Sequence, residues 1–115
     1  MKVQITSQGC NDPPNAGKNC AANSGSIKVN GRERSINRRG LNVVVVEFAT
    51  GKFVAAKNFD THGSRRATYK FIAFVDKIKP NSLVFVAAKD SFTGSMFAKA
   101  YSALVCCTAY LHSIF

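Results

Sequence analysis

The chain has 115 residues, the usual length of one domain, and 46% of them are hydrophobic, which is enough to fill one core. Charged residues make up 19%, too few to predict global disorder. The formal net charge is +10, from 16 Lys and Arg against six Asp and Glu, so it favours acidic partners such as nucleic acid, an acidic glycan or an anionic membrane surface. No apolar run is long enough to span a bilayer.

Residues 1–25 are expected to form an N-terminal strand and a cysteine-containing loop. Apolar and polar residues alternate from Val3 to Gln8, which predicts the strand. Residues 11–25 are rich in Asn, Pro and Gly, which predicts the loop. Residues 1–9 lack the apolar centre of a signal peptide, so we expect either an intracellular protein or a mature or truncated segment of a secreted one.

A hairpin is predicted after this loop. Residues 27–29 alternate in character and are followed by Asn30 and Gly31, the strongest two-residue hairpin signal. We expect the return strand over residues 32–36 and a basic turn over residues 37–40.

Four arginines crowd into eight positions of this segment: Arg32, Arg34, Arg38 and Arg39. They could simply form a solvated, basic loop. If the protein binds an acidic glycan, they are the expected site, because the guanidinium fork matches carboxylate and sulfate geometry.

The centre of the chain is expected to form two strands. Residues 41–48 include four consecutive valines, which predicts a strand covered on both faces in the middle of a sheet. Thr50 and Gly51 predict a tight turn, and residues 53–59 are expected to return as the second strand. Residues 60–64 are expected to be a loop.

Two helices and one strand are predicted in the remainder. Ser64 is placed to cap a helix that runs to about Ile78, and Pro80 with Asn81 ends it. Residues 83–88 predict an apolar strand.

Asp90 or Ser91 is expected to cap the second helix. The predicted apolar face of that helix comprises Phe97, Tyr101, Leu104, Val105 and Thr108. The order of the elements predicts an α+β domain without internal repeats.

The four cysteines, Cys10, Cys20, Cys106 and Cys107, do not have the spacing of a zinc site. In an oxidising compartment, Cys10 could pair with Cys20, or either could pair with Cys106 or Cys107. In a reducing compartment all four would be free thiols. The irregular loop around the first two favours disulfides and secretion.

No catalytic site is predicted. The carboxylates are not spaced for a shared acid–base role, and His62 beside Asp60 is too little for a metal site or a general base. We expect Asp60 to order its loop and Asp90 to cap the helix. No cofactor is predicted.

An ordered set of motifs carries a family resemblance. Residues 39–46 read RGLN followed by four valines, and residues 50–52 read TGK. Residues 59–61 read FDT, and residues 81–87 read NSLVFVA. In this order they resemble the domain of the interleukin-like EMT inducer (ILEI) and pancreatic-derived factor (PANDER) family, also called the GG domain.

The resemblance covers roughly residues 26–104, the expected domain core. It implies a compact β-β-α globule with two small mixed or antiparallel sheets flanked by two or three helices, outside the cell and without enzyme activity. Residues 105–115 do not match the closing strand of the family and form a divergent or truncated tail. That difference predicts an exposed sheet edge.

We therefore favour a secreted, non-catalytic recognition domain that binds a glycan, such as an acidic polysaccharide, or a cell-surface receptor. One alternative is a cytokine-like signalling protein with a protein receptor, and another is a basic polyanion- or nucleic-acid-binding protein. The expected ligand-binding residues are Arg32, Arg34, Arg38, Arg39, Asp60, Thr61 and His62.

Overall fold

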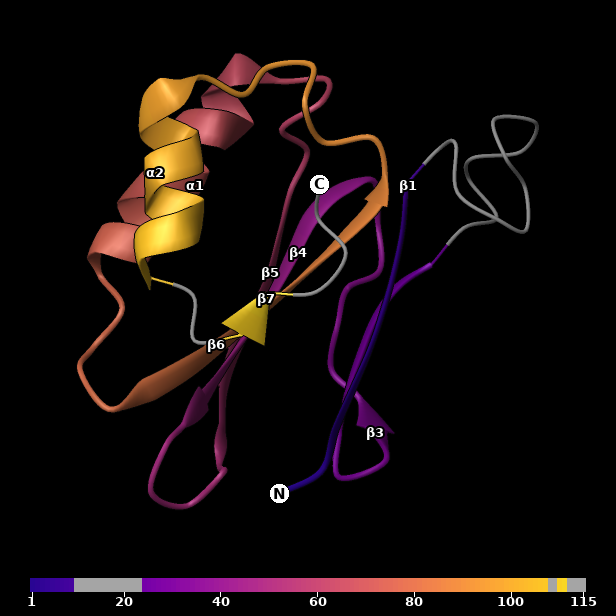
Figure 1. The fold of residues 1–115 in the computed structure, drawn as a ribbon, viewed down its shortest axis with the longest axis vertical. Coiled ribbons are helices and arrows are strands. Elements are labelled where there is room, and N and C mark those ends of the chain that lie inside the picture. Colours follow the sequence, from indigo (N-terminus) through magenta and orange to yellow (C-terminus); the bar gives the residue numbers. More distant parts are fainter. Residues whose placement is uncertain (10–23, 108–109, 112–115) are drawn as a thin grey trace.

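The structure is a computed structural model that describes residues 1–9, 24–107 and 110–111 (Figure 1). This part of the chain contains seven strands and two helices. In chain order they are β1 (Val3–Gly9), β2 (Gly25–Val29), β3 (Arg32–Glu33), β4 (Gly40–Glu47), β5 (Phe53–Phe59), α1 (Arg65–Asp76), β6 (Ser82–Asp90), α2 (Ala98–Cys107) and β7 (Tyr110–Leu111).

All the strands belong to one sheet, in the order β3-β2-β1-β6-β4-β5, with β7 paired to β6. β4 is antiparallel to both of its neighbours, β5 and β6. β1 pairs in two directions: it is antiparallel to β2 and then parallel to β6 at Gln8–Lys89 and Gly9–Asp90. The sheet is therefore mixed.

The side chain of Ser7 lies where β1 changes its pairing partner from β2 to β6. The hydroxyl of Ser7 donates to the carbonyl oxygen of Ala88 (2.9 Å) and accepts from its N–H (3.0 Å). Ser7 thus satisfies the two backbone groups of β6 that lie just before the parallel pairs begin. This contact joins two segments 81 residues apart.

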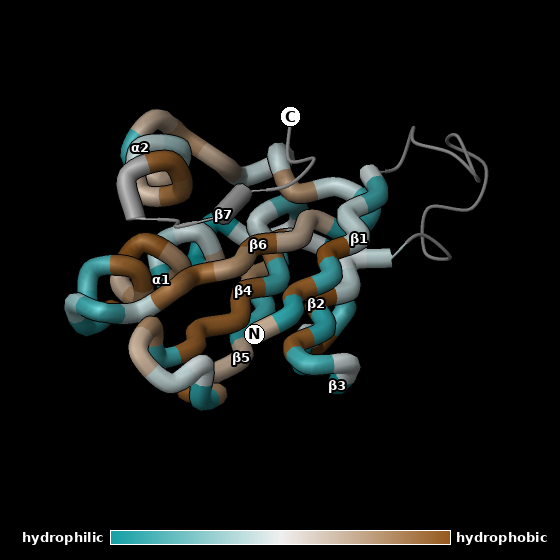
Figure 2. Tube along the Cα trace, turned by 60° about the horizontal axis from the view of Figure 1, so that its bottom comes forward, coloured by the Kyte–Doolittle hydropathy of each residue, from teal (hydrophilic) through white to brown (hydrophobic). Residues whose placement is uncertain are grey.

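The sheet curls so that β4 is covered on both faces (Figure 2). On one face, Val43 and Val45 belong to a core that includes Phe71 of α1 and Leu104 of α2. On the other, Val44 joins residues of β1, β2 and β6 in a second core. The four valines are buried on both faces because two layers cover the strand, which confirms the prediction of a central strand.

The predicted compact α+β class is confirmed, with two helices in the described part. The prediction of two sheets is not confirmed, because β1 pairs with both β2 and β6 and so joins the two halves into one curled sheet. The divergent tail was expected to leave one sheet edge exposed. In the structure, β7 of that tail pairs with residues 85–86 of β6.

Several local predictions are confirmed. The side chain of Ser64 caps α1 by accepting from the Ala67 N–H at 3.1 Å. Asn30 and Gly31 adopt positive φ values of 52° and 79°, as a two-residue hairpin turn requires. The return strand of this hairpin is shorter than predicted and ends at Glu33, because the Glu33 carboxylate itself accepts from the Ile27 N–H and takes the place of further strand pairing.

The predicted start of the second helix is wrong. Asp90 is the last residue of β6, with a φ of 61°, and α2 begins only at Ala98. Val105 is 63% exposed, whereas Ala100 and Leu104 are fully buried. The buried face of α2 is therefore rotated from the one expected. Thr108 lies outside the described residues, and α1 ends at Asp76, two residues before the predicted end.

Candidate functional site

The four predicted arginines do not form one cluster. Arg34 lies at the hairpin end of the sheet, where its guanidinium carbon is 4.3 Å from the centre of the Phe53 ring. Phe53 pairs with Val46, near the C-terminal end of β4, whereas Arg38 and Arg39 directly precede the first residue of β4. Six residues of extended strand separate these ends by roughly 20 Å. Arg32, two residues before Arg34 in the same hairpin, lies at the same end of the sheet as Arg34.

Arg39 and Asp60 meet in a bidentate ion pair. The Nε of Arg39 lies 3.0 Å from Oδ1 of Asp60, and one terminal nitrogen lies 2.7 Å from Oδ2. Asp60 Oδ1 also accepts from the Gly63 N–H at 3.1 Å, so the carboxylate orders its loop as expected. The pair joins the start of β4 to the end of β5.

This contact sets the charge of Asp60. The hydrogen bond from Arg39 lowers the pKa of the Asp60 carboxyl, partial burial opposes that effect, and the Gly63 N–H adds to the lowering. The same hydrogen bond raises the pKa of Arg39. Asp60 is therefore held as an anion by a structural partner.

The two residues after Asp60 differ in their exposure. Thr61 is fully buried, and its hydroxyl donates to the Phe92 carbonyl oxygen at 2.6 Å. His62 is exposed, and its carbonyl oxygen accepts from the Ser95 hydroxyl at 3.2 Å. Of the predicted polar contact loop, only His62 and part of Asp60 face solvent, and ligand binding there stays a prediction.

The remaining motif residues also have structural roles. Gly40 has a φ of 103°, and a β-carbon there would lie 2.2 Å from the Phe59 carbonyl oxygen, so only glycine fits. Asn42 is fully buried, and its side-chain nitrogen donates to the carbonyl oxygens of Arg38 (2.9 Å) and Ala87 (3.2 Å). Its oxygen accepts from the Arg38 N–H (3.1 Å) and the Asn58 side chain (3.0 Å). These residues hold the fold.

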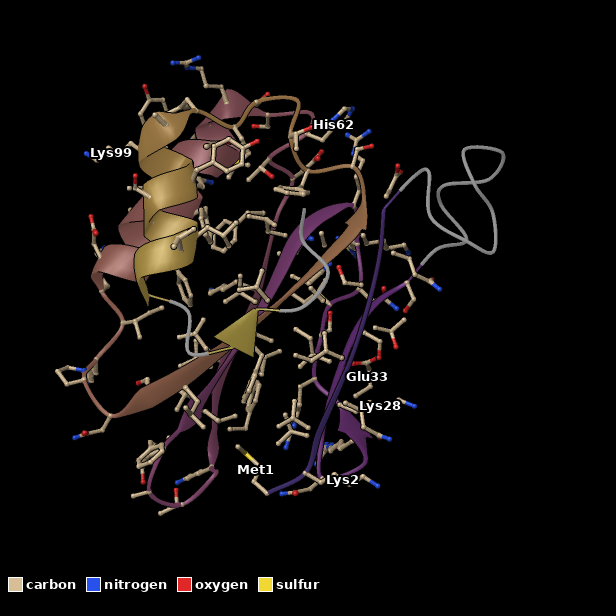
Figure 3. The ribbon with its side chains drawn as sticks, in the orientation of Figure 1. Met1, Lys2, Lys28, Glu33, His62 and Lys99 are labelled. Atoms are coloured by element: carbon tan, nitrogen blue, oxygen red, sulfur yellow. The ribbon has the colours of Figure 1, made fainter. Side chains whose placement is uncertain are left out.

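Three segments that carry basic residues meet instead at the end of the sheet where the turns of the β2–β3 and β4–β5 hairpins lie. We call Lys2, Lys28, Arg32, Arg34 and Lys52 the hairpin-end patch. The backbone nitrogen of Lys2 donates to Asn30 in the hairpin turn (2.9 Å), which brings the chain start beside β2 and β3. A β-carbon at Gly51 would lie 3.4 Å from the Met1 sulfur, so the β4–β5 turn meets the same end. Figure 3 shows Lys2, Lys28 and Glu33 together there.

The carboxylates near the patch are engaged with neutral donors. Glu33 accepts from the Ser26 hydroxyl and from the N–H groups of Ile27 and Ser35. Glu47 accepts from the Thr50 hydroxyl at 2.9 Å. Within the described ranges, the single ion pair of the protein is Arg39–Asp60. The cations of the patch therefore have no carboxylate partner among those residues.

A pocket of about 750 Å³ lies on the helix side of the sheet, where the β4–β5 hairpin meets the end of α1. Its walls are mainly apolar, and Phe48 and Val54 at its mouth are 66% and 58% exposed. The sequence patterns did not predict this pocket, because Phe48 directly follows the apolar run of β4 and Val54 lies in a strand expected to pair with it.

Other predicted features can be placed only in part. Cys10 and Cys20 lie outside the described residues, as do the side chains of Cys106 and Cys107 in α2, so their pairing stays a prediction. Among the residues described, no three His, Cys, Asp or Glu side chains come together as a metal site. The described helices include none that is long and apolar enough to cross a membrane.

The family comparison agrees with the structural roles of these motifs. The model of the interleukin-like EMT inducer (ILEI) family matches residues 39–107, more than half of the chain. The chain therefore belongs to the ILEI family, which is cytokine-like, and the predicted resemblance is confirmed. No curated protein matches the chain. The match begins at Arg39, so Lys2, Lys28, Arg32 and Arg34 of the patch precede it.

Replacing Asn42 by Ala is expected to lower the free energy of unfolding by about 3 kcal/mol, because several buried polar groups lose their partner. The matched control is Asn58→Ala, which removes one hydrogen bond of Asn42 and the contacts of the Asn58 amide with the carbonyl oxygens of Arg38 and Arg39. Because Asn58 is only half-buried, water can replace it, and the expected cost is about 1 kcal/mol. Urea denaturation measures both. Equal costs would contradict the network described for Asn42.

Replacing Asp60 by Asn is expected to lower the melting temperature at neutral pH. Because the folded-state pKa of Asp60 is lowered, its contribution is present above the ordinary pKa of an aspartate and is lost as pH falls through the lowered value. The difference in melting temperature between wild type and variant should therefore become smaller in acid. Asp76→Asn, on the exposed face of α1, is the control. A gap independent of pH would count against the ion pair.

Proposed function

We propose that the protein is an extracellular, non-catalytic recognition domain and that its hairpin-end patch binds an acidic glycan of the cell surface. The observation that carries the proposal is that three segments with five basic residues meet at one end of the sheet. Membership of a cytokine-like family supports an extracellular role.

The patch has the properties that a sulfated or carboxylated sugar chain requires. Arg32 and Lys28 are exposed, and Arg34 is held in place by stacking on Phe53. A pre-positioned guanidinium loses less conformational freedom when it binds an anion. Because Glu33 is turned toward donors of its own hairpin, the cations remain available to a ligand.

Arg38 and Arg39 are not part of this proposed site. They lie at the opposite end of β4, and the side chain of Arg39 is already paired with Asp60. The chain therefore supplies its own control, because Arg38 and Lys99 of α2 can be removed away from the patch with the same change in net charge.

The test is retention on a heparin column and the dissociation constant for a heparin-derived oligosaccharide. The double variant Arg32→Gln/Arg34→Gln is expected to elute at lower salt and to bind about tenfold more weakly. The control Arg38→Gln/Lys99→Gln removes the same charge elsewhere and should elute near wild type. Equal losses in the two double variants would show a general charge effect and contradict the patch.

Cell binding separates the glycan from a protein receptor. The proposal expects binding to fall when heparinase removes surface glycans or when salt is raised, because exposed ion pairs are screened. Binding that survives both treatments would indicate the cytokine-like alternative with a protein receptor.

The extracellular setting predicts that the cysteines are oxidised. Mass spectrometry of the protein from an oxidising expression system should show a mass lower by two hydrogen atoms for each disulfide, with few thiols that react with iodoacetamide. Four reactive thiols in that material would contradict secretion and favour the intracellular nucleic-acid-binding alternative.

A further inference from the structure

The apolar pocket is separate from the hairpin-end patch. Its floor and walls come from the helix-facing side of β4 and β5 and from the last turn of α1, and they comprise Val45, Phe48, Val54, Ala55, Phe74 and Ile78. The patch lies on the side of the same hairpin that faces β1–β3. The two surfaces are thus on opposite faces of the β4–β5 hairpin.

The mouth of the pocket is apolar although it meets water. The Phe48 N–H donates to the Asn81 carbonyl oxygen at 2.7 Å, which fixes the backbone of Phe48 against the start of β6 while its ring stays 66% exposed. Val54 is the residue that the register shift between Val45 and Val46 leaves without a partner in β4. The local irregularity therefore turns an apolar side chain to the pocket mouth instead of to the core.

Two basic residues line this pocket next to the end of α1, Lys77 and Lys79, and both are exposed to solvent. The backbone of Lys77 closes α1 by donating to the Phe74 carbonyl oxygen at 3.1 Å, so its position is fixed by the helix end. Neither lysine has a carboxylate partner within the part of the chain that the structure describes. The one carboxylate that lines the pocket, Glu47, is bonded to the Thr50 hydroxyl.

We propose that this pocket binds one single-chain amphiphile with an anionic head group, a fatty-acid carboxylate in its simplest form. The hydrocarbon chain would cover Phe48, Val54 and the apolar floor, and the carboxylate would lie between Lys77 and Lys79. The volume of about 750 Å³ falls within the range of small-ligand sites. Charge complementarity selects the sign of the head group.

The same observations disfavour a second copy of the chain as the occupant. The formal net charge of +10 resists self-association, and both pocket lysines would add to the repulsion. A protein partner that uses the exposed apolar side chains alone would gain nothing from the two lysines. The dependence on head-group charge therefore separates the alternatives.

The experiment is isothermal titration calorimetry of the full chain with decanoate below the concentration at which it forms micelles. Decyltrimethylammonium, with the same chain length and the opposite charge, is the matched probe. We expect one decanoate per chain, bound at least about tenfold more tightly than the cation. Amide shifts in NMR spectra should fall on Ala49, Ala55 and Asn81. No binding, or equal affinity for the two probes, would overturn the proposal.

Two variants localise the site. Lys77→Gln/Lys79→Gln is expected to weaken decanoate binding about tenfold, whereas Lys70→Gln/Lys99→Gln, with the same net charge, should leave it unchanged. Val54→Asp places a carboxylate at the pocket mouth and should abolish binding while heparin retention persists. Equal weakening by both double variants, or full binding by Val54→Asp with an unchanged melting curve, would overturn the pocket as the site.

Discussion

The amide of Asn42 lies where β2 crosses β4 and β6, out of contact with water, and its hydrogen bonds join four segments of the chain. A buried amide is tolerated only when its donors and acceptors are satisfied, so the neighbouring backbone must take one arrangement. The Asn42 side chain bonds to the backbone N–H and carbonyl oxygen of Arg38 and so fixes the turn before β4. The close crossing of β2 requires Gly25, where a β-carbon would lie 2.7 Å from the Asn42 nitrogen. The curl of the sheet depends on this point.

The ion pair of Arg39 and Asp60 continues the same arrangement on the surface. It joins the start of β4 to the end of β5, next to the glycine that lets the strands approach. The most recognisable residues of the family thus serve the scaffold. The two surfaces that we propose as binding sites lie at the other end of the β4–β5 hairpin, one basic and one apolar.

The sequence allowed good prediction where local chemistry decides the structure. The valines of β4, the Asn30-Gly31 turn and the Ser64 cap each act within a few residues, so their patterns were sufficient. Predictions were wrong or incomplete where distant contacts decide. The face of α2 depends on how the helix rests on α1. β6 continues to Asp90, so the expected cap belongs to a strand, and α2 begins eight residues later.

The candidate site shows the same division. Proximity in sequence suggested one cluster of four arginines, but an extended segment places its two ends far apart. In addition, Arg39 forms an ion pair with Asp60, 21 residues away in the sequence. Lys2 and Lys52 joined the basic patch only through tertiary contacts. The pocket depends on a register shift between β4 and β5, which no pattern of apolar residues reveals.

The Ser7–Ala88 contact has a consequence for the order of folding. β4 and β5 are joined by a short turn, so their pairing closes a small loop, whereas β1 reaches β6 only after a loop of 81 residues has closed. The hairpin and α1 can therefore form early, while β1 docks late and completes the curl. Until then, the face of β4 and β6 that β2 later covers is open to other chains, and the rate of β1 docking sets how long a nascent molecule is prone to aggregate.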